Sequence, residues 1–299
     1  MSLSIEDDAL HLQSSERSWR ESYYFNFVDE ERGISCFATI GIMPNLKIRE
    51  FVFAIFYKNK KKIYYNELKS SMPVDLNEIL SDGKLCFKLE RPLKQWQIFY
   101  YDPEVSVDLS WDSRSPPIDF GEGSGTSWLR HFEQPGKVRG KMRLADGTSI
   151  EIDGLGQRDK SWGPRNWHID GWFAMHAQFN ELSIGLRRDT VGSISKTSGY
   201  ILSGNEIVAI SDLKLETIFS KATNRMPVGA KTVIYGSDGS KYSLVSKLMA
   251  PNTYAKFERD FGQSVTELYE EMAIHECSGL KGRGTGLIEW LITRTKVFG

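Results

Sequence analysis

The stretch VSVDLSWD, residues 105–112, indicates the fold class. One face of this stretch is apolar and consists of Val105, Val107, Leu109 and Trp111. The residues between them are serine or aspartate. Successive side chains of a strand point to opposite faces, so this alternation predicts a β-strand with one face toward a core.

Runs of aromatic and β-branched residues recur along the chain, as expected of strands. Clear examples are residues 21–29, 35–43, 49–58 and 96–102. The lysine-rich run 58–62 stands between two aromatic-rich stretches and predicts a solvated hairpin tip.

Turn residues separate many of these runs. Asp146-Gly147, Gly204-Asn205 and Asp238-Gly239 each stand between strand-forming residues, the pattern typical of a β-hairpin. Helical patterns are few. Residues 257–276 are the best helix candidate, although their last part is equally compatible with a strand, and a short helix is predicted within 66–80.

A chain of 299 residues has room for one large domain or two of ordinary size. GLGQRDKSW (154–162) and GLKGRGTGLIEW (279–290) resemble each other, and each ends a β-rich half of the chain. We therefore predict two β-units, residues 1–165 and 166–299.

Charge and composition exclude several kinds of partner and compartment. The net charge of −1 gives no reason to expect nucleic acid or an anionic membrane surface. No apolar run is long enough for membrane insertion, and the first residues do not resemble a secretory signal. Cys36, Cys86 and Cys277 are scattered and form no CxxC pair, which argues against zinc and disulfides. We expect a cytoplasmic protein, and nothing in the sequence specifies its oligomeric state.

The stretch GQRDKSWGPRNW, residues 156–167, is too polar for a core and too aromatic for an ordinary loop. Asp159 stands close in sequence to Trp162 and Trp167. In a dry aromatic pocket the pKa of a carboxyl rises, so that it could protonate an alkene, and aromatic faces could stabilise the resulting cation.

Two features of the same stretch favour other interpretations. Arg158 and Lys160 flank Asp159 and would lower its pKa, although neighbours in a strand point to the opposite face. Asp159 could instead form an ion pair with Arg165, with the tryptophans filling a junction between domains.

The next stretch, HIDGWFAMHAQF (168–179), alternates between an apolar face and an unusual polar one. The polar face consists of His168, Asp170, Trp172, His176 and Gln178. It is predicted to be the wall of a pocket, a domain interface or a plain outer face. Along a strand Asp170 and His176 would be about 20 Å apart, so one metal ion could not join them.

Sequence motifs of nucleophilic catalysis and of phosphate binding are not found in this chain. There is no GxSxG motif, and the glycine-rich segment 121–128 lacks the ending of a phosphate-binding loop, so we expect no nucleotide and no other cofactor. Glu289 interrupts an apolar strand pattern, so it either pairs with an arginine or is a second carboxylate of a site.

The pattern G-x-R-D-x-S-W-G-x-R-x-W, with EQPGKVRGKMRLADG (133–147) before it and GWFAMHAQF (171–179) after it, resembles a known superfamily. The resemblance is to an uncharacterised bacterial branch of the AttH-like and carotenoid 1,2-hydratase (hydroxyneurosporene synthase) proteins. It implies an all-β fold of two lipocalin-like β-barrel domains packed side by side, with few short helices. Relatives of this kind add water to isoprenoid chains, or cyclise them, without a redox cofactor.

The resemblance gives Asp159 the role of proton donor in a hydratase, cyclase or isomerase that acts on an isoprenoid or polycyclic substrate. His168 or His176 would position water or return a proton. The residues expected to bind the substrate are Arg158, Trp162, Arg165, Trp167, Asp170, Trp172, Gln178 and Glu289.

A lipocalin-like carrier or sensor of a lipophilic small molecule is the alternative, since small barrels readily enclose such ligands. A purely structural role for the tryptophans and arginines is the third. The enzyme and the carrier both require a hydrophobic small molecule as partner.

Overall fold

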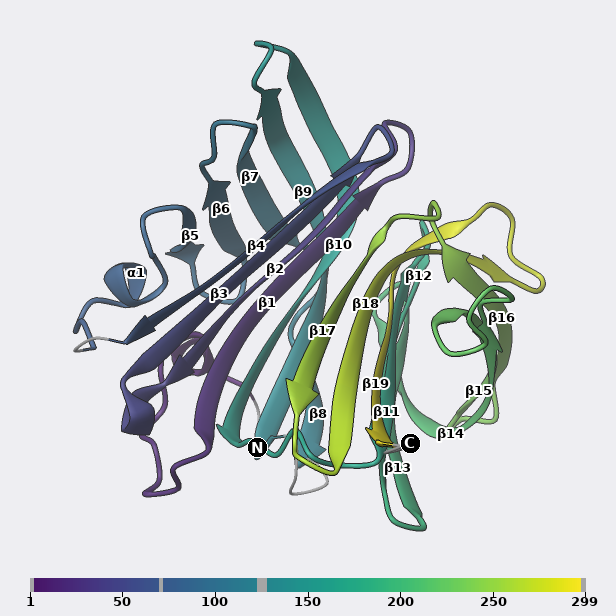
Figure 1. The fold of residues 1–299 in the computed structure, drawn as a ribbon. Helices are drawn as coiled ribbons and strands as arrows, with labels where there is room; N and C mark the ends of the chain where they lie inside the picture. Colours follow the sequence, from purple (N-terminus) through teal and green to yellow (C-terminus); the bar gives the residue numbers. More distant parts are fainter. Residues whose placement is uncertain (1–2, 70–71, 123–127, 297–299) are drawn as a thin grey trace. The chain divides into compact units, whose positions relative to one another are not determined.

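The structure, a computed structural model, describes residues 3–69, 72–122 and 128–296. Within these residues almost all regular structure is β, and the α-helix α1 (Leu76–Ile79) is a single turn. The prediction of an all-β fold is therefore confirmed. The chain forms two compact units, Met1–Arg165 and Asn166–Gly299, which we call the N-terminal and the C-terminal unit (Figure 1).

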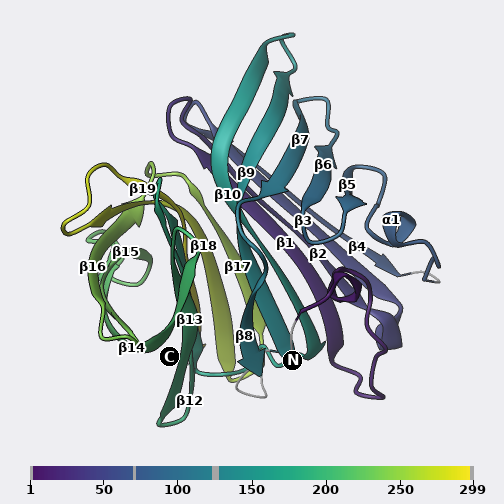
Figure 2. The same cartoon turned by 180° about the vertical axis from the view of Figure 1, so that it is seen from behind.

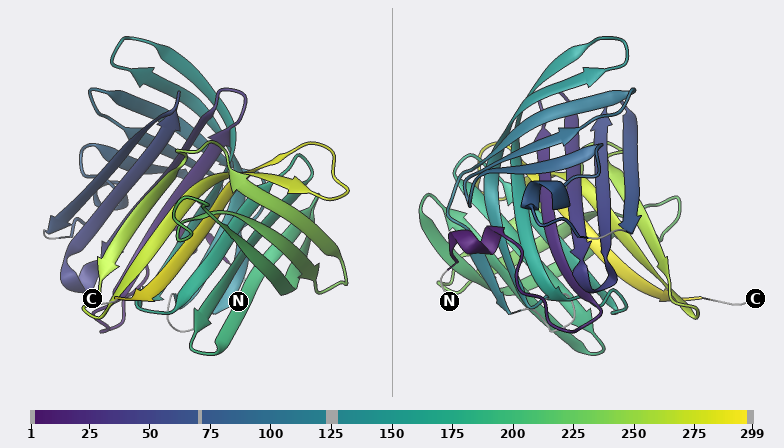
Figure 3. Two further views of the ribbon diagram at one scale, coloured as in Figure 1. Left: turned by 45° about the vertical axis from the view of Figure 1, so that its right-hand side comes forward. Right: turned by 90° about the vertical axis from the view of Figure 1, so that its left-hand side faces the viewer.

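The N-terminal unit is one antiparallel sheet that curls into a half-barrel (Figure 3, right). Its strands lie in the order β4 (Lys60–Lys69), β3 (Ile48–Tyr57), β2 (Ile34–Met43), β1 (Trp19–Asp29), β10 (Ser149–Pro164), β9 (Arg130–Leu144), β7 (Val105–Ser113), β6 (Gln95–Tyr100) and β5 (Leu85–Arg91). The short β8 (Ile118–Glu122) also pairs with β9 (Figure 2). Among the described residues the edge strands β4 and β5 do not pair, so this unit is not the closed barrel that the resemblance implies.

The C-terminal unit is a closed barrel of eight antiparallel strands. Around the ring they are β16 (Lys241–Leu248), β15 (Pro227–Gly236), β14 (Glu206–Phe219), β13 (Ile194–Ser203), β12 (Leu182–Val191), β11 (Gly171–Gln178), β19 (Gly284–Thr295) and β18 (Ser264–Cys277). β18 closes the ring because it is long enough to pair with two strands along one edge. Its first half pairs with β17 (Tyr254–Asp260) and its second half with β16.

Alternation of side chains builds both cores. Along β7 the apolar residues Val105, Val107, Leu109 and Trp111 are buried, whereas the polar residues between them are partly exposed. They join the core of the half-barrel. A second core lies inside the barrel, and β11 contributes Phe173, Met175 and Ala177 to it.

The predicted hairpins are confirmed. Gly147, Gly204 and Gly239 have positive φ and connect β9 to β10, β13 to β14 and β15 to β16. The lysine-rich tip is confirmed too, because Lys58 and Asn59 have φ of 46° and 59° between β3 and β4. Two positive φ values fit the type I′ turn that matches the twist of a hairpin.

The predicted helix over 257–276 is wrong, because these residues belong to β17 and β18. Within β18 the apolar core residues Tyr269, Ala273 and Cys277 recur every four positions, which suits one face of a helix as well as one face of a strand. The strand assignment left open for the end of this segment is the observed one. Of the helix predicted within 66–80, only α1 is present, and residues 70–71 lie outside the described range.

Candidate functional site

Strand β10 presents charged residues to the inner face of the half-barrel. Arg158 pairs across the sheet with Phe25, and Lys160 pairs with Tyr23, and both aromatic residues belong to the core. Arg158 and Lys160 therefore point inward. Asp159, between them, faces the other side of the sheet, as neighbours in a strand must.

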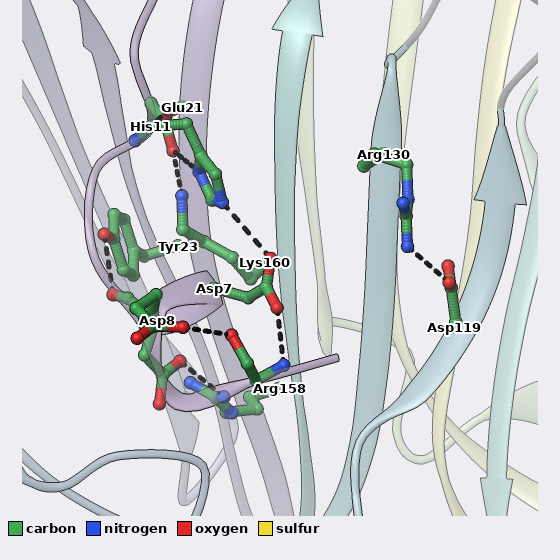
Figure 4. A network of polar contacts seen from close by, with 11 residues as sticks. Asp7, Asp8, His11, Glu21, Tyr23, Asp119, Arg130, Arg158 and Lys160 are labelled. Carbon is green, nitrogen blue, oxygen red and sulfur yellow. Dashed lines mark hydrogen bonds and ion pairs between the residues drawn. The ribbon is translucent and has the colours of Figure 1, made fainter. Parts of the chain in front are cut away.

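Arg158 is only 1% exposed, and its charge is balanced by Asp8, which is fully buried. The Arg158 Nη2 atom lies 2.6 Å from Asp8 Oδ1 (Figure 4). The Nε atom of Arg158 donates to Gln134 Oε1 at 2.7 Å. Three rings surround the guanidinium, with centroids 5.0–5.6 Å from Cζ. They belong to Trp96, Trp111 and Phe132.

Lys160 is paired in the same way with Glu21, and both side chains are buried. The backbone N–H of His11 donates to Glu21 at 2.9 Å, and the His11 ring is 3.2 Å from the same carboxylate. Burial alone would raise the pKa of Glu21, but Lys160 and His11 outweigh burial and hold it below its usual value. Asp8, Glu21, Arg158 and Lys160 together form what we call the sheet cluster, in which each charge has an opposite partner.

A second polar group lies inside the barrel of the C-terminal unit, on β18. Glu267, Glu271 and His275 share the inward face with the core residues Tyr269 and Ala273. Side chains two positions apart in a strand point to the same side, so the sequence itself carries these polar groups into the apolar interior.

Glu271 is fully buried, and neither carboxyl oxygen has a hydrogen-bond partner among the described residues. Across the sheet it faces Ile288. Burial raises the pKa of Glu271 to about 9, so at neutral pH the side chain is an uncharged carboxylic acid.

His275 lies four residues after Glu271 on the same face of β18 and is also fully buried. Its Nδ1 lies 2.8 Å from the hydroxyl of Ser246, which in turn lies 3.6 Å from the sulfur of Met175. Burial lowers the pKa of His275 to about 3, partly opposed by the backbone of His176, so the ring is neutral. We call Ser246, Glu271 and His275 the barrel cluster.

The row of positions between Glu271 and His275 is occupied by small residues. Ala273 on β18 pairs with Gly286 on β19, which pairs with Ala177 on β11. A Cβ added at Gly286 would lie 3.3 Å from Nε2 of His275, so this imidazole lies close to the glycine backbone. The acid and the histidine are thus separated by a strip without bulky side chains.

Glu267 contrasts with Glu271 although it lies only four residues away. It accepts hydrogen bonds from Arg225, Lys256 and Arg294 at 2.7–3.2 Å. Burial alone would raise its pKa, but these three cations outweigh it and lower the pKa of Glu267 to about 2. Glu267 is therefore ionised, and Glu271 is not.

The residues predicted for the site are divided between the two units. In the N-terminal unit Asp159 is partly exposed, so the burial expected of it is not observed, and its role as proton donor stays a prediction. Trp162 is buried and stacks on the ring of His11 at 3.7 Å, and Arg165 donates to Ser161 at 2.9 Å.

The other predicted residues belong to the C-terminal unit. His168 is exposed, stacks on Phe261 and lies 2.9 Å from the Ser264 hydroxyl. Asp170 is exposed as well and accepts a hydrogen bond from the backbone of Gly192 at 2.6 Å.

Five predicted residues lie on the outward face of β11 or beside it. Trp172 packs 5.6 Å from the ring of Trp167 and donates to Glu289, so the partner of Glu289 is an indole rather than the predicted arginine. His176 and Gln178 are each 1% exposed. Their roles in binding or catalysis stay predictions.

Glu271, His275 and Ser246 are not among the residues predicted from the sequence. The first two lie in the segment predicted to be a helix, where they would not share a strand face with Tyr269 and Ala273. Reading this segment with a period of two would have placed Glu267, Glu271 and His275 on one otherwise apolar face, which is the signal of a polar group inside a barrel.

The described residues contain neither a metal-binding group of side chains nor a membrane-spanning helix. Among residues 3–69, 72–122 and 128–296 no three His, Cys, Asp or Glu side chains form a group that could hold a metal ion. Within the same ranges, the helices are too short or too polar to span a bilayer.

Solved structures with the same fold are found at low sequence identity. One is "Crystal structure of kievitone hydratase from Nectria haematococca", with a TM-score of 0.65 and 15% identity over 95% of this chain and 91% of that one. Another is "Crystal structure of CghA with Sch210972", with a TM-score of 0.65 and 10% identity over 95% of this chain and 90% of that one. At these identities the likeness shows the fold alone.

Sequence comparisons give a family but no annotated relative. The search of the curated proteins finds no match. The family described as "Domain of unknown function (DUF7064)" matches residues 4–294, almost the whole chain. The chain is therefore a member of the DUF7064 family.

Proposed function

We propose that this protein is a cofactor-independent enzyme that transfers a proton to a hydrophobic, isoprenoid or polycyclic, substrate within the barrel of the C-terminal unit. The observation that carries the proposal is Glu271, a fully buried carboxyl without a hydrogen-bond partner among the described residues. An unsatisfied buried polar group costs stability, so its presence needs a reason, and a catalytic acid is one.

The proposed step uses Glu271 first as an acid and then as a base. The carboxyl proton moves to a carbon of the substrate, leaving a carboxylate and a substrate cation. Water adds to the cation and returns a proton to the carboxylate, which completes a hydration. Loss of a proton from a neighbouring carbon to the same carboxylate would instead complete an isomerisation. It would complete a cyclisation if a second double bond of the substrate first adds to the cation, which forms the ring bond and moves the positive charge to the far carbon of that double bond. Atoms and charges balance without a cofactor in each case.

The pKa of Glu271 limits which substrates suit this step. A carboxyl with a pKa of about 9 is a weak acid but a strong base once ionised. It therefore suits an electron-rich carbon, such as that of an enol or a conjugated polyene, better than an isolated alkene.

His275 is proposed to position the water. Its ring is neutral, because burial lowers its pKa to about 3, so one ring nitrogen can accept a hydrogen bond. The contact of Nδ1 with the Ser246 hydroxyl fixes the ring orientation. The small residues Ala273 and Gly286 lie between the acid and this histidine.

The comparisons support an activity of this class. One protein of the same fold is named as a hydratase, and another was crystallised with the small molecule Sch210972. A carrier of a lipophilic molecule is the second candidate. The full enclosure of Glu271 by the apolar barrel favours it, since a carrier needs an enclosed interior and no turnover.

Mass spectrometry after incubation with pooled isoprenoid and steroid lipids in D₂O tests the proposal. We expect a lipid that gains water or deuterium with the wild-type protein and with Glu276→Gln, an exposed control on the same strand. Glu271→Gln should abolish the change and still bind the lipid.

Other outcomes reject part or all of the proposal. Turnover that survives Glu271→Gln but is lost in Asp159→Asn would transfer the acid role to Asp159. A lipid that is retained by the wild-type protein without exchange would identify a carrier.

A further inference from the structure

A second potential binding site lies in the N-terminal unit, where Arg158 is enclosed by aromatic rings. Its guanidinium is buried among Trp96, Trp111 and Phe132. Such a setting favours a planar anion, because arginine binds carboxylates through two parallel N–H groups and aromatic faces accept the rest of an aromatic molecule.

In this conformation the carboxylate beside Arg158 comes from Asp8, in the 3-10 turn Ile5–Asp8 near the start of the chain. Asp8 is the buried residue of that turn. Its second oxygen accepts a hydrogen bond from the backbone of Leu93, and its carbonyl accepts one from Tyr23 at 3.0 Å.

The connection between this turn and the sheet buries little surface, and the Asn45 side chain holds it through hydrogen bonds to the carbonyls of Ser14 and Glu16, both 2.8 Å. Residues 12–18, which lead from the turn to β1, are all exposed. His11 is held by Glu21 and by stacking on Trp162, but the residues around Asp8 otherwise bury little surface. Segments that bury so little surface open at lower cost than a core strand.

Two unused hydrogen-bond donors lie beside the same arginine. Trp96 and Trp111 are fully buried, and neither indole N–H has a hydrogen-bond partner among the described residues. Buried indole N–H groups are normally satisfied. An additional oxygen-bearing molecule at Arg158 would provide acceptors for them, which Asp8 does not.

We propose that Arg158 is a binding site for the carboxylate of an aromatic or polycyclic acid, and that Asp8 is an internal occupant which such a ligand displaces. Arg158 rather than Lys160 has this role, because the partner of Arg158 belongs to the turn Ile5–Asp8, whereas Glu21, the partner of Lys160, belongs to the sheet strand β1. The ligand's ring system would pack on Trp96, Trp111 and Phe132. This site shares no residue with the barrel cluster. A negative result in the test of this site would therefore leave the proposed enzymatic function unaffected.

Calorimetric titration with 1-naphthoate tests the proposal, with the uncharged 1-naphthamide as the matched ligand. Asp8→Asn removes the internal competitor and should lower the Kd for naphthoate by at least about tenfold, since the binding-competent population rises. Glu16→Gln, an exposed acid of the same segment, should leave the Kd unchanged. Asp8→Asn combined with Arg158→Met should abolish binding without leaving an unpaired charge.

A measurement on the wild-type protein needs no variant to fold. Naphthoate should accelerate tryptic cleavage after Arg17, because displacing Asp8 releases the segment before β1. The proposal is overturned if naphthamide binds as well as naphthoate, if Asp8→Asn binds naphthoate no better than the wild-type protein, or if naphthoate does not affect the cleavage.

Discussion

The sheet cluster and the barrel cluster place similar groups in similar surroundings with opposite electrostatic outcomes. In the sheet cluster Arg158 and Lys160 are matched by Asp8 and Glu21, so four buried groups carry no net charge. In the barrel cluster burial acts on Glu271 without opposition and keeps its proton in place. Burial alone therefore does not make a group reactive. A buried charge that has its partner stabilises one arrangement of the chain, whereas a buried acid without one holds a proton that it can give away.

The largest effect should come from removing half of a pair in the sheet cluster. Lys160→Met removes the main counter-charge of the buried Glu21 carboxylate, which keeps only its contacts with His11. We expect a loss of about 3–5 kcal/mol in the free energy of unfolding. The double variant Glu21→Gln/Lys160→Met should recover most of it. Urea denaturation at pH 7 measures both. A loss of less than about 1 kcal/mol in the free energy of unfolding of the single variant is what an exposed ion pair would give. It would show that pairing does not stabilise the sheet cluster.

The pH dependence of stability should carry the signature of Glu271. Its folded pKa of about 9 lies above the usual 4.5, so between these values the folded state holds a proton that the unfolded state has lost. Stability should therefore fall as the pH rises through this window, by about 1.4 kcal/mol per pH unit from this one group.

Subtracting the pH profile of Glu271→Gln from that of the wild-type protein isolates this contribution. The variant has no proton to lose, so its free energy of unfolding should be flatter between pH 6 and 8. Parallel profiles would mean that Glu271 is ionised in the folded protein and has found a partner.

A smaller gain should follow from removing the acid. Glu271→Leu, studied at pH 5, replaces an unsatisfied carboxyl by an apolar group and should stabilise the barrel by about 1–3 kcal/mol. Thermal and urea denaturation would detect this. Destabilisation instead would show that the carboxyl is hydrogen-bonded in solution, and the contrast with the sheet cluster would weaken.

The smallest effect is expected for an ion pair at an exposed position. Arg225 pairs with Glu267, but its side chain is 52% exposed, and Lys256 and Arg294 contact the same carboxylate. Arg225→Ala should therefore cost less than about 1 kcal/mol in urea denaturation. A loss of free energy of unfolding as large as that of Lys160→Met would show that the exposure of the arginine side chain matters less than the ion pair itself.

Local patterns predicted most of the fold. Alternation identified strands such as β7, and Asp-Gly pairs located hairpins, because both depend on neighbours within a few residues. Barrel closure depends on β16 meeting β18 about 30 residues later in the chain, and the open edge of the half-barrel depends on β4 and β5 not meeting. No local pattern contains that information.

The candidate site was less predictable than the fold. Alternation correctly placed Arg158 and Asp159 on opposite faces, and the aromatic content around them indicated an aromatic environment. The partner of Arg158 is Asp8, 150 residues away in sequence, so no spacing could suggest it. The position of Glu271 on an inward strand face was not predicted, because the four-residue spacing of Tyr269 and Ala273 also fits a helix.

The open edge of the half-barrel has a consequence for the behaviour of the protein at high concentration. An unpaired strand edge can recruit another chain and start aggregation, and lysines along the edge oppose this by electrostatic repulsion. The edge strand β4 begins with the exposed Lys60 and Lys61, whereas Lys62 pairs with Asp102 and Glu104 and Lys69 pairs with Glu67. The lysine run that first suggested a solvated turn thus also protects an edge that the closed barrel of the C-terminal unit does not have.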